Sequence, residues 1–578
     1  MATLTTQRPG KKISPLGVGI LLAGGCIPGY QDTPIPPCFF ADDPDPACQS
    51  GQGHDGSGSG GDVPTTGTAF PGDGSNAEDS ESQGPGDGTD TSEVDVETTT
   101  GIGGSESTGP AVEPVPEIVD LDLDPDAPKS AGPVTVKVQA ENAVEVWMTM
   151  DDGGEVALEP VGDDGTEFVG EIAVLGESWN GLHTVSVIAR AGELESLPAE
   201  AMFTVTAPAA GTEAWKRKSS ITPSFGNAVA VDEQGEVYEL FTESGNAGAR
   251  CHVRRRSAQG DVVWPQDTTP LAVGVYCIGE DIKVAPDGTL WVLVNTKSAN
   301  IWRWQLFNLD ADGTVLGGTT EPSDVNETGR GLDVNAAGEV LLCGVRPALQ
   351  GEDAWVQLRP SVGDGWTVPW PYKSGNSEFD ERTKDCAFIE DRIVIVGDAF
   401  GQHDDMNLFD YASRGFVVEL GLNGTKLAQD VAADSPALQS VHEAVAPDGA
   451  GGYVTVGYNC DAKVVPCTPT AGMLRWFELG ADLAKEQPVA TAGTVWDVAV
   501  SPSGHAVVAG QALEMEQGFL VQAWLPTQGG ALWNYKGTPS SLQSATGVAL
   551  SPYGSVYAGG VYLDNNVFAA GVVKLHPY

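Results

Sequence analysis

Two acidic stretches of this chain carry the residue types that bind cations. Ser377–Asp385 reads S-E-F-D-E-R-T-K-D, and Gly401–Arg414 reads G-Q-H-D-D-M-N-L-F-D-Y-A-S-R. Converging carboxylate oxygens are the ligands that Ca²⁺ prefers. The sequence therefore predicts a ligand or cation site, with Ca²⁺ as its candidate cofactor; the alternative is a hydrophilic surface loop. The seven predicted site residues are Glu378, Asp380, Glu381, His403, Asp404, Asp405 and Asp410.

The spacings of common catalytic motifs are absent, so no catalytic residue is predicted. The sequence contains no H-E-x-x-H, no G-x-S-x-G and no G-x-x-x-x-G-K-[ST]. Asn308–Gly313 resembles the first half of an EF-hand loop, but Thr319 stands at the twelfth position, and a plain Asp-Gly turn is expected. Trp215, Trp264 and Trp533 recur at a regular spacing, which predicts packing between repeats rather than a quinone cofactor site.

The elements that must position the acidic stretches are repeated hairpins. Trp496–Gln511, W-D-V-A-V-S-P-S-G-H-A-V-V-A-G-Q, predicts two short strands around a Pro-Ser-Gly turn. The turn glycines recur with a period of roughly 50 to 55 residues, which is typical of repeat architectures. The six other copies are Ala228–Phe241, Asp281–Val294, Leu332–Gly344, Cys386–Gly397, Glu443–Gly457 and Gly547–Gly560.

Each unit continues into a third and a fourth strand, so residues 211–578 are predicted to form a seven-bladed β-propeller in an all-β chain. The last unit stops after its third strand, at Val572–Tyr578. Gly211–Trp215 matches the fourth strand of the sixth unit and is expected to pair with the last unit and close the ring. An open solenoid is the alternative. In a propeller both acidic stretches emerge on the same face, beside the loop Tyr458–Gly472.

The repeat resembles the delta-sixty type of bacterial propeller repeat. The matching core is V-x-V-x-P-x-G-x-x-x-V-A-G at Val498–Gly510, with a close copy at Val548–Gly559. This resemblance covers most of the last 370 residues, which are the predicted propeller, residues 211–578. It implies the propeller fold and export, and it carries no activity to transfer.

The N-terminus predicts export. Arg8, Lys11 and Lys12 precede the short apolar run Ile13–Gly25, which has the layout of a secretory signal. Leu22–Cys26 resembles the bacterial lipobox, which implies lipidation of Cys26 and an outer-membrane-anchored lipoprotein, on the cell surface or on the periplasmic side. Residues 1–26 are thus expected to be the signal peptide with its lipidation site, and plain secretion is the alternative. No other membrane span is predicted.

Two further segments separate the signal from the repeats. Residues 27–113 are rich in Gly, Ser, Asp, Thr and Pro and are predicted to be a disordered acidic linker. Residues 114–208 are predicted to form an Ig-like β-sandwich, with Trp147 in its core. Within it, Trp179–Ala189 resembles a late strand of bacterial immunoglobulin-like domains. The predicted strands include Val134–Val138, Val144–Met148, Glu167–Val174, His183–Ile188 and Met202–Val205.

The cysteine count fits an oxidising compartment. Of nine cysteines, eight remain once Cys26 is set aside, an even number that predicts disulfides in an exported protein. The absence of C-x-x-C argues against redox catalysis. The expected pairs are Cys38 with Cys48, Cys460 with Cys467, Cys251 with Cys277, and Cys343 with Cys386.

The formal charge of -50 argues against nucleic acid as a partner and against anionic lipid surfaces, because like charges repel. The function predicted first is a monomeric, lipid-anchored binding or scaffold protein that recognises a protein or glycan on the propeller face. The lipid is then the only contact with the membrane. The alternative is an extracellular polysaccharide hydrolase or lyase that uses acidic residues of that face. A role in outer-membrane protein assembly is a third option, by fold analogy alone.

Overall fold

The structure is a computed structural model. It describes residues 114–577 apart from 152, 163, 246–247, 265, 267, 273–275, 321–325, 349–350, 360–369, 372–378, 402–411, 432–437, 462–468, 490–491, 513–517, 538–543 and 565–566. The regular structure in this part of the chain is antiparallel β-strand, apart from one 3-10 turn, η2 (Glu177–Trp179). No described helix is long and apolar enough to cross a membrane.

The segment from residue 114 to 208 forms two sheets around one core. One sheet has the order β1-β2-β6-β5, and the other has the order β4-β3-β7-β8 with β9 paired to β7. Every second residue of β2, including Val134, Val136 and Val138, is buried in this core, as the alternation of a half-buried strand requires. The strands are β1 (Glu117–Asp124), β2 (Gly132–Glu141), β3 (Glu145–Met150), β4 (Glu155–Ala157), β5 (Glu159–Val161), β6 (Glu167–Val174), β7 (Gly181–Ala191), β8 (Leu194–Glu195) and β9 (Ala199–Val205).

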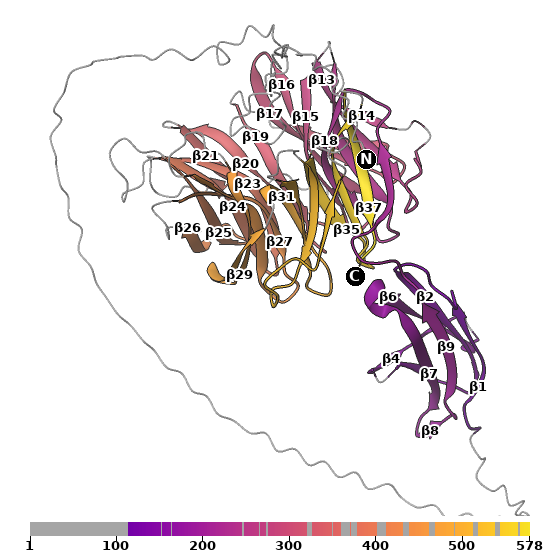
Figure 1. The fold of residues 1–578 in the computed structure, drawn as a ribbon. Coiled ribbons are helices and arrows are strands. Elements are labelled where there is room, and N and C mark those ends of the chain that lie inside the picture. Colours follow the sequence, from indigo (N-terminus) through magenta and orange to yellow (C-terminus); the bar gives the residue numbers. More distant parts are fainter. Residues whose placement is uncertain are drawn as a thin grey trace, which may run out of the picture. The chain divides into compact units, whose positions relative to one another are not determined.

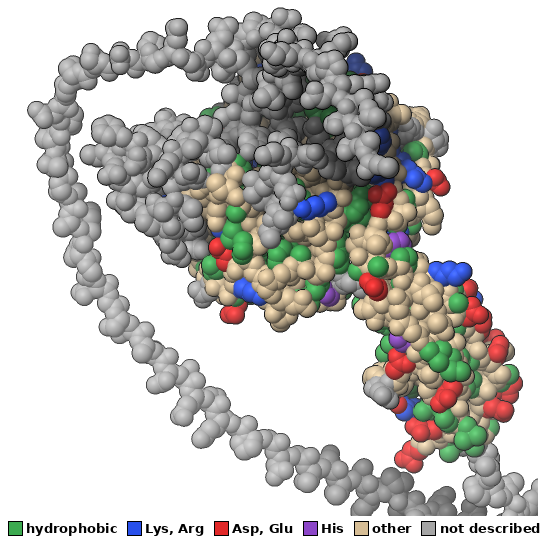
Figure 2. Space-filling model, in the orientation of Figure 1, with side chains coloured by type: hydrophobic (Ala, Val, Ile, Leu, Met, Phe, Trp, Pro, Cys, Tyr) green, Lys and Arg blue, Asp and Glu red, His purple; other side chains and the backbone are tan. Residues whose placement is uncertain are grey.

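The prediction that Trp147 lies in this core is wrong. The neighbours Val146 and Met148 are buried in the core, so Trp147 points to the outer face of the sheet. There its indole N–H donates to Glu145 at 3.1 Å, and the Arg190 guanidinium lies 5.5 Å from the ring centroid. Figure 2 shows Asp and Glu side chains spread over the visible face of this two-sheet segment.

The remainder of the described chain forms seven four-stranded antiparallel sheets, which follow one another in the colour order of Figure 1. Each of the seven repeated hairpins provides the first two strands of one sheet. The strands, sheet by sheet, are β11–β14 (Ser224–Val231, Val237–Gly245, Gly248–Arg256, Thr269–Leu271), β15–β18 (Tyr276–Val284, Leu290–Ser298, Ile301–Leu309, Val315–Thr320), β19–β22 (Thr328–Val334, Val340–Ala348, Gly351–Arg359, Trp370–Pro371), β23–β26 (Phe379–Ile389, Arg392–Gly401, Ala412–Gly421, Lys426–Val431), β27–β30 (Leu438–Pro447, Tyr453–Asp461, Pro469–Glu478, Asp482–Val489), β31–β34 (Ala492–Val500, Ala506–Ala512, Phe519–Trp524, Trp533–Lys536), and β35–β37 (Ser544–Leu550, Val556–Asp564, Val567–Leu575) with β10 (Glu213–Lys218).

The first strands of successive sheets contact one another in a cycle. β11 contacts β15, β15 contacts β19, and the series continues through β23, β27 and β31 to β35, which contacts β11. The predicted closing pair is confirmed: β10 pairs with β37, with Glu213 opposite Leu575 and Lys218 opposite Gly571. The first segment of the repeat region thus completes the last sheet, in a propeller-like arrangement.

The recurring tryptophans pack between neighbouring sheets, as expected. Trp215 donates its indole N–H to the Ala258 carbonyl at 2.9 Å, and Trp264 donates to the Ala311 carbonyl at 2.9 Å. Each of these carbonyls lies in the turn that follows the third strand of the next sheet. The turn glycine Gly260 has φ +88°, and a Cβ there would lie 2.9 Å from Cδ2 of Trp215. Glycine is therefore required at this position both for its backbone conformation and for the space it leaves.

The fourth sheet replaces the Pro-x-Gly turn with a tighter one. In the sixth sheet the turn is closed by the Gly504 N–H on the Ser501 carbonyl (2.9 Å), and the Ser501 hydroxyl accepts from the His505 N–H (3.1 Å). In the fourth sheet Ile389 pairs directly with Arg392, so two residues make the turn, and Glu390 takes a positive φ of 53°.

Two of the predicted disulfides are present, and each joins neighbouring sheets. Cys251–Cys277 links β13 to β15, and Cys343–Cys386 links β20 to β23. Cys460 is disulfide-bonded as well. The other predicted disulfide cysteines, Cys38, Cys48 and Cys467, and the predicted lipidation site Cys26 all lie outside the described residues.

Candidate functional site

The inner strand of every sheet carries a β-bulge at the same place. The register of the first and second strands slips by one residue at equivalent points in all seven sheets. A bulge bends its strand and re-aims the side chains next to it. The inserted residues are half-buried and form a ring: Asn227, Glu280, Arg330, Lys384, Glu443, Trp496 and Thr546.

The residues of this bulge ring pair across neighbouring sheets. Glu280 lies 3.7 Å from Arg330, and Lys384 lies 3.7 Å from Glu443. Burial raises the pKa of the Glu280 carboxyl, and the positive charge of Arg330 partly offsets this. The Thr546 hydroxyl donates to a carbonyl of the first sheet, that of Gly226, at 2.9 Å. The bulges therefore place one belt of polar contacts around the inside of the ring.

Four aspartates next to this belt clamp successive sheets together. Asp281 accepts the N–H of the following residue at 2.7 Å and the N–H of Leu332, on the next sheet, at 3.1 Å. Asp333, Asp385 and Asp497 repeat the arrangement, accepting from the next sheet at 2.7 to 2.9 Å. One carboxylate thus satisfies two backbone donors and joins two sheets. The inter-sheet acceptor pairs are Asp281–Leu332, Asp333–Phe388, Asp385–Val445 and Asp497–Val548.

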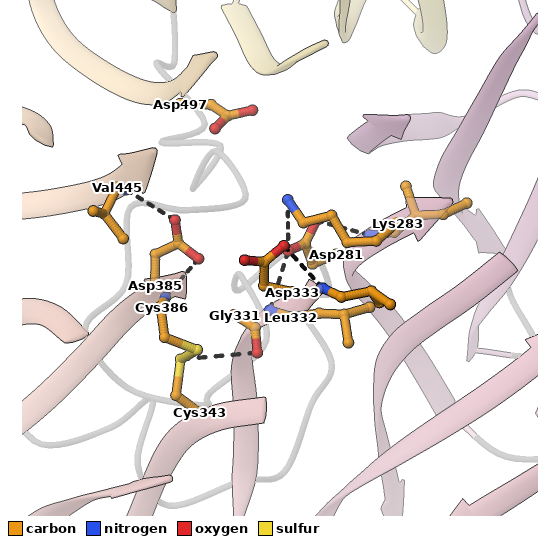
Figure 3. A network of polar contacts seen from close by, with 12 residues as sticks. Asp281, Lys283, Gly331, Leu332, Asp333, Cys343, Asp385, Cys386, Val445 and Asp497 are labelled. Carbon is orange, nitrogen blue, oxygen red and sulfur yellow. Dashed lines mark hydrogen bonds and ion pairs between the residues drawn. A yellow bond between two sulfur atoms is a disulfide. The ribbon is translucent and has the colours of Figure 1, made fainter. Parts of the chain in front are cut away.

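Lys283 lies among these four carboxylates, and together they form an aspartate–lysine cluster (Figure 3). Figure 3 shows the side chains of Lys283 and the four aspartates converging on the space between the inner strands. The Lys283 Nζ lies 3.5 Å from Oδ2 of Asp281, and the lysine side chain keeps 40% of its accessible surface. The cluster therefore faces water inside the ring rather than a dry core, and its charges are partly screened.

Burial and mutual repulsion perturb the protonation of this cluster. Burial raises the pKa of Asp281 and Asp333, raises that of Asp385 well above its usual range, and raises that of Asp497 to about 6. The Lys283 ammonium is the largest opposing influence on all four. Burial disfavours the charge of Lys283 in turn, but the carboxylates, Asp281 first, raise its pKa overall. Burial thus brings the protonation of the most perturbed of these carboxyls closer to neutral pH.

The residues predicted as a ligand or cation site are mostly outside the described residues: Glu378, His403, Asp404, Asp405 and Asp410. Asp380 and Glu381 lie in β23, so the prediction that Ser377–Asp385 is a connection is wrong for most of its length. Glu381 is buried, and the adjacent Arg382 pairs with Asp398 at 2.7 Å. Because Arg382 and Asp398 neutralise each other's charge, these polar residues can lie in a largely buried strand.

The part of the chain that the structure describes contains no set of ligands for calcium. No group of three or more His, Cys, Asp or Glu side chains there has the geometry to hold a metal ion. The EF-hand-like stretch is a turn, as expected, because Oδ1 of Asp310 accepts the backbone N–H of Asp312 (3.0 Å) and of Thr314 (2.7 Å).

The aspartate–lysine cluster is the part of the site that sequence reasoning missed. The repeats did contain a signal, because Asp281, Asp385 and Asp497 occupy the same position in D-I-K-V, D-C-A-F and D-V-A-V. Aligning the copies on these aspartates would have predicted that they share one level of the ring. Asp333 and Lys283 stand two residues further along their own strands, beyond that pattern.

Comparisons with known proteins assign no family to this chain. No known family matches the chain, and no curated protein is similar in sequence. The polysaccharide lyase Uly1 has 11% identity and a TM-score of 0.40, with 62% of this chain and 91% of that chain covered. A PL25 ulvan lyase bound to a saccharide has 9% identity and a TM-score of 0.42, with 63% and 96% covered. A protein of unknown function from Bacteroides caccae has 14% identity and a TM-score of 0.29, with 55% and 92% covered. Each of these similarities has a TM-score of 0.42 or below, and none assigns this chain a family or an activity.

Proposed function

We propose that this chain is an exported binding or scaffold protein built on a seven-bladed β-propeller, residues 211–578, which follows an immunoglobulin-like sandwich, residues 114–208. The cyclic contacts of the seven sheets and the β10–β37 pair support the propeller. The two-sheet core supports the sandwich. Disulfides between sheets fit an extracytoplasmic protein, because such bonds persist in oxidising compartments.

The observation that carries the proposal is the bracing of the ring. Every one of the four aspartates ties its own sheet to the next, and the Cys251–Cys277 and Cys343–Cys386 bonds tie two further pairs of strands. Rigid scaffolds of this kind present loops whose residues recognise partners. Each of the four carboxylates inside the ring accepts two backbone N–H groups and so has a structural role. This favours recognition over catalysis as the function of the protein.

The proposed recognition site is the acidic face of the fourth unit, with a protein or glycan as partner and Ca²⁺ as its candidate ion. The proposed site residues are Glu378, Asp380, His403, Asp404, Asp405 and Asp410, whereas Glu381, predicted with them, is buried in β23. The chain upstream supplies the anchor in this proposal: a signal ending at Cys26, the lipid on Cys26, and the acidic linker 27–113. The protein is then a monomeric lipoprotein of the outer membrane.

The alternative function is a polysaccharide hydrolase or lyase. One observation favours it: burial raises the pKa of neighbouring carboxyls, that of Asp497 to about 6 and that of Asp385 well above its usual range. Enzymes use carboxyls with raised pKa values as general acids. Asp497→Asn would then abolish product formation, while retaining one side-chain oxygen for the Val548 N–H.

Binding and cleavage of polysaccharides by the full chain separate these functions. Purified protein is incubated with a panel of polysaccharides, and saturable binding and newly formed reducing or unsaturated ends are both measured. Binding without products, weakened at least tenfold by Asp404→Asn with Asp405→Asn, supports the recognition site. The matched control exchanges Asp287 and Asp391, exposed turn residues, for asparagine. Product formation that Asp497→Asn abolishes supports the enzyme. If the protein neither binds nor cleaves any of the glycans, the proposed partner is a protein, which cross-linking then tests.

A further inference from the structure

His183, on β7 of the sandwich, is held between two hydrogen-bond acceptors. Its Nδ1 lies 2.9 Å from Oδ2 of Asp151, and its Nε2 lies 2.7 Å from the backbone carbonyl oxygen of Trp179. The ring stacks on Phe203, with centroids 5.2 Å apart. The imidazole is therefore fixed in position by its stacking and by partners at both nitrogens.

This arrangement is complete only when the imidazole is protonated. A neutral histidine has one N–H and one lone pair, whereas the imidazolium has two N–H donors. A backbone carbonyl oxygen can only accept, and Asp151 is held as a carboxylate, because its hydrogen bonds with His183 and with the Thr184 N–H lower its pKa. A neutral ring would turn a nitrogen lone pair toward one of these oxygens.

The same few residues hold the chain where it leaves the sandwich. Trp179 ends the turn η2, and the next residue, Asn180, exchanges two hydrogen bonds with the backbone of Ala207, at 2.6 and 2.9 Å. The Glu177 carboxylate, also on η2, accepts the N–H of Ala210 at 2.7 Å. Both contacts lie on the segment that leads from β9 to β10.

We propose that His183 is a proton-operated clamp on this exit segment. When the imidazole is protonated, its bond to the Trp179 carbonyl fixes η2, and η2 fixes Ala207 and Ala210. When the proton is lost, the remaining N–H stays on Nδ1, because the charged carboxylate of Asp151 is the stronger acceptor. The bond from Nε2 to the Trp179 carbonyl is then lost, and the turn that holds the exit segment is released on that side.

The charged surroundings of the ring agree with this role. Burial disfavours the imidazolium, but the hydrogen bonds to Asp151 and to the Trp179 carbonyl outweigh it and raise the pKa of His183. Asp151, from the turn after β3, is the ionisable group described in contact with the ring, while β9 contributes Phe203 and η2 contributes Trp179. A raised histidine pKa means that the clamp is closed below the unfolded pKa of about 6.5 and opens as the pH rises through the folded value.

A titration of the full chain tests the protonation directly. Histidine labelled at its ring atoms is followed by NMR, and His183 is assigned by comparison with His183→Phe. We expect a pKa above about 6.5 and N–H signals on both ring nitrogens at about pH 6. A pKa at or below that value, or a ring that carries one proton at about pH 6, overturns the proposal.

Hydrogen exchange at Ala207 and Ala210 tests the clamp itself. After correction for intrinsic exchange, protection in the parent should fall between about pH 6 and about pH 8.5, by up to tenfold for each unit by which the pKa is raised. His183→Phe retains an aromatic ring against Phe203 and should show no such fall. His505→Phe, in a turn of the sixth sheet, is the matched control and should behave as the parent. Equal pH dependence in the parent and in His183→Phe contradicts the clamp, whatever the titration shows.

Discussion

Replacing Lys283 with methionine removes the positive charge among the four clamping aspartates and leaves most of the side-chain stem. The lysine ammonium lowers the pKa of every one of these carboxyls, so without it they repel one another when ionised. The same carboxylates join successive sheets. We therefore expect Lys283→Met to destabilise the ring by loosening these clamps.

The separation of the charges sets the size of the effect. At the 3.5 Å between Nζ of Lys283 and Oδ2 of Asp281, Coulomb's law gives about 5 kcal/mol at an effective dielectric of about 20 and about 1 kcal/mol in bulk water. Because the lysine keeps 40% of its accessible surface, solvent screens the pair and the lower half of this range applies. A loss of about 1 to 3 kcal/mol in the free energy of unfolding is expected at neutral pH.

The loss should depend on pH with a definite sign. Burial raises the folded-state pKa of the four carboxyls, so the stability that each contributes is present below its unfolded pKa and is lost as the pH rises through the folded value, about 6 for Asp497. Lys283 stays charged throughout this window, because its own pKa is raised. The effect of Lys283→Met should therefore be largest near about pH 7.5 and shrink toward about pH 5, as the pH falls through the raised folded-state pKa values, about 6 for Asp497.

Thermal unfolding of the full chain, followed at both pH values, measures this difference. Exchange of the Leu332 and Val548 amides, which the clamps protect, reports on the cluster itself. Lys426→Met, on the fourth strand of the fourth sheet, is the control and should lower stability by little at either pH. A loss in Lys283→Met that is the same at both pH values, or larger at the acidic one, would refute the electrostatic reasoning.

Three further changes test other parts of the structure. Replacing Cys343 and Cys386 with serine should cost about 4 kcal/mol in denaturant unfolding, since the bond closes a loop with a sequence separation of 43 residues; an equal midpoint with and without the bond would contradict this. Gly260→Ala should cost about 1 to 3 kcal/mol, and more than Gly288→Ala, because both have positive φ but only the first meets an indole; equal melting temperatures would exclude the clash. Cys26→Ser should move the protein from the membrane fraction to the soluble fraction, and a variant that remains with the membrane would rule out the lipid as its anchor.

The sequence was sufficient for the parts of the fold that local patterns encode. The hairpin copies, the incomplete last unit and the resulting β10–β37 pair follow from strand alternation and turn residues, and the Cys251–Cys277 and Cys343–Cys386 bonds follow from the placement of cysteines in adjacent copies. These features depend on short-range spacing, which a single sequence shows.

The site was less accessible to the same reasoning, because it depends on register. A bulge shifts the side chains that face the ring interior by one residue, and nothing in the residue types of Glu280 or Lys384 marks an insertion. The first part of β23, residues 379–385, resembles a connection in sequence because it is rich in charged residues, whereas Arg382 and Asp398 neutralise one another in the fold. Strand alternation alone likewise did not tell which face of β3 carries Trp147.

The pairing of β10 with β37 has a consequence for biosynthesis. β10 is made before any sheet of the ring exists, whereas its partner contains residues up to Leu575, close to the end of the printed sequence. Six sheets can form while the chain is still being extended, but the last sheet must wait until Val567–Leu575 has been made. Until then β10 has an unpaired edge rich in lysine and arginine, and this charge discourages association with other nascent chains.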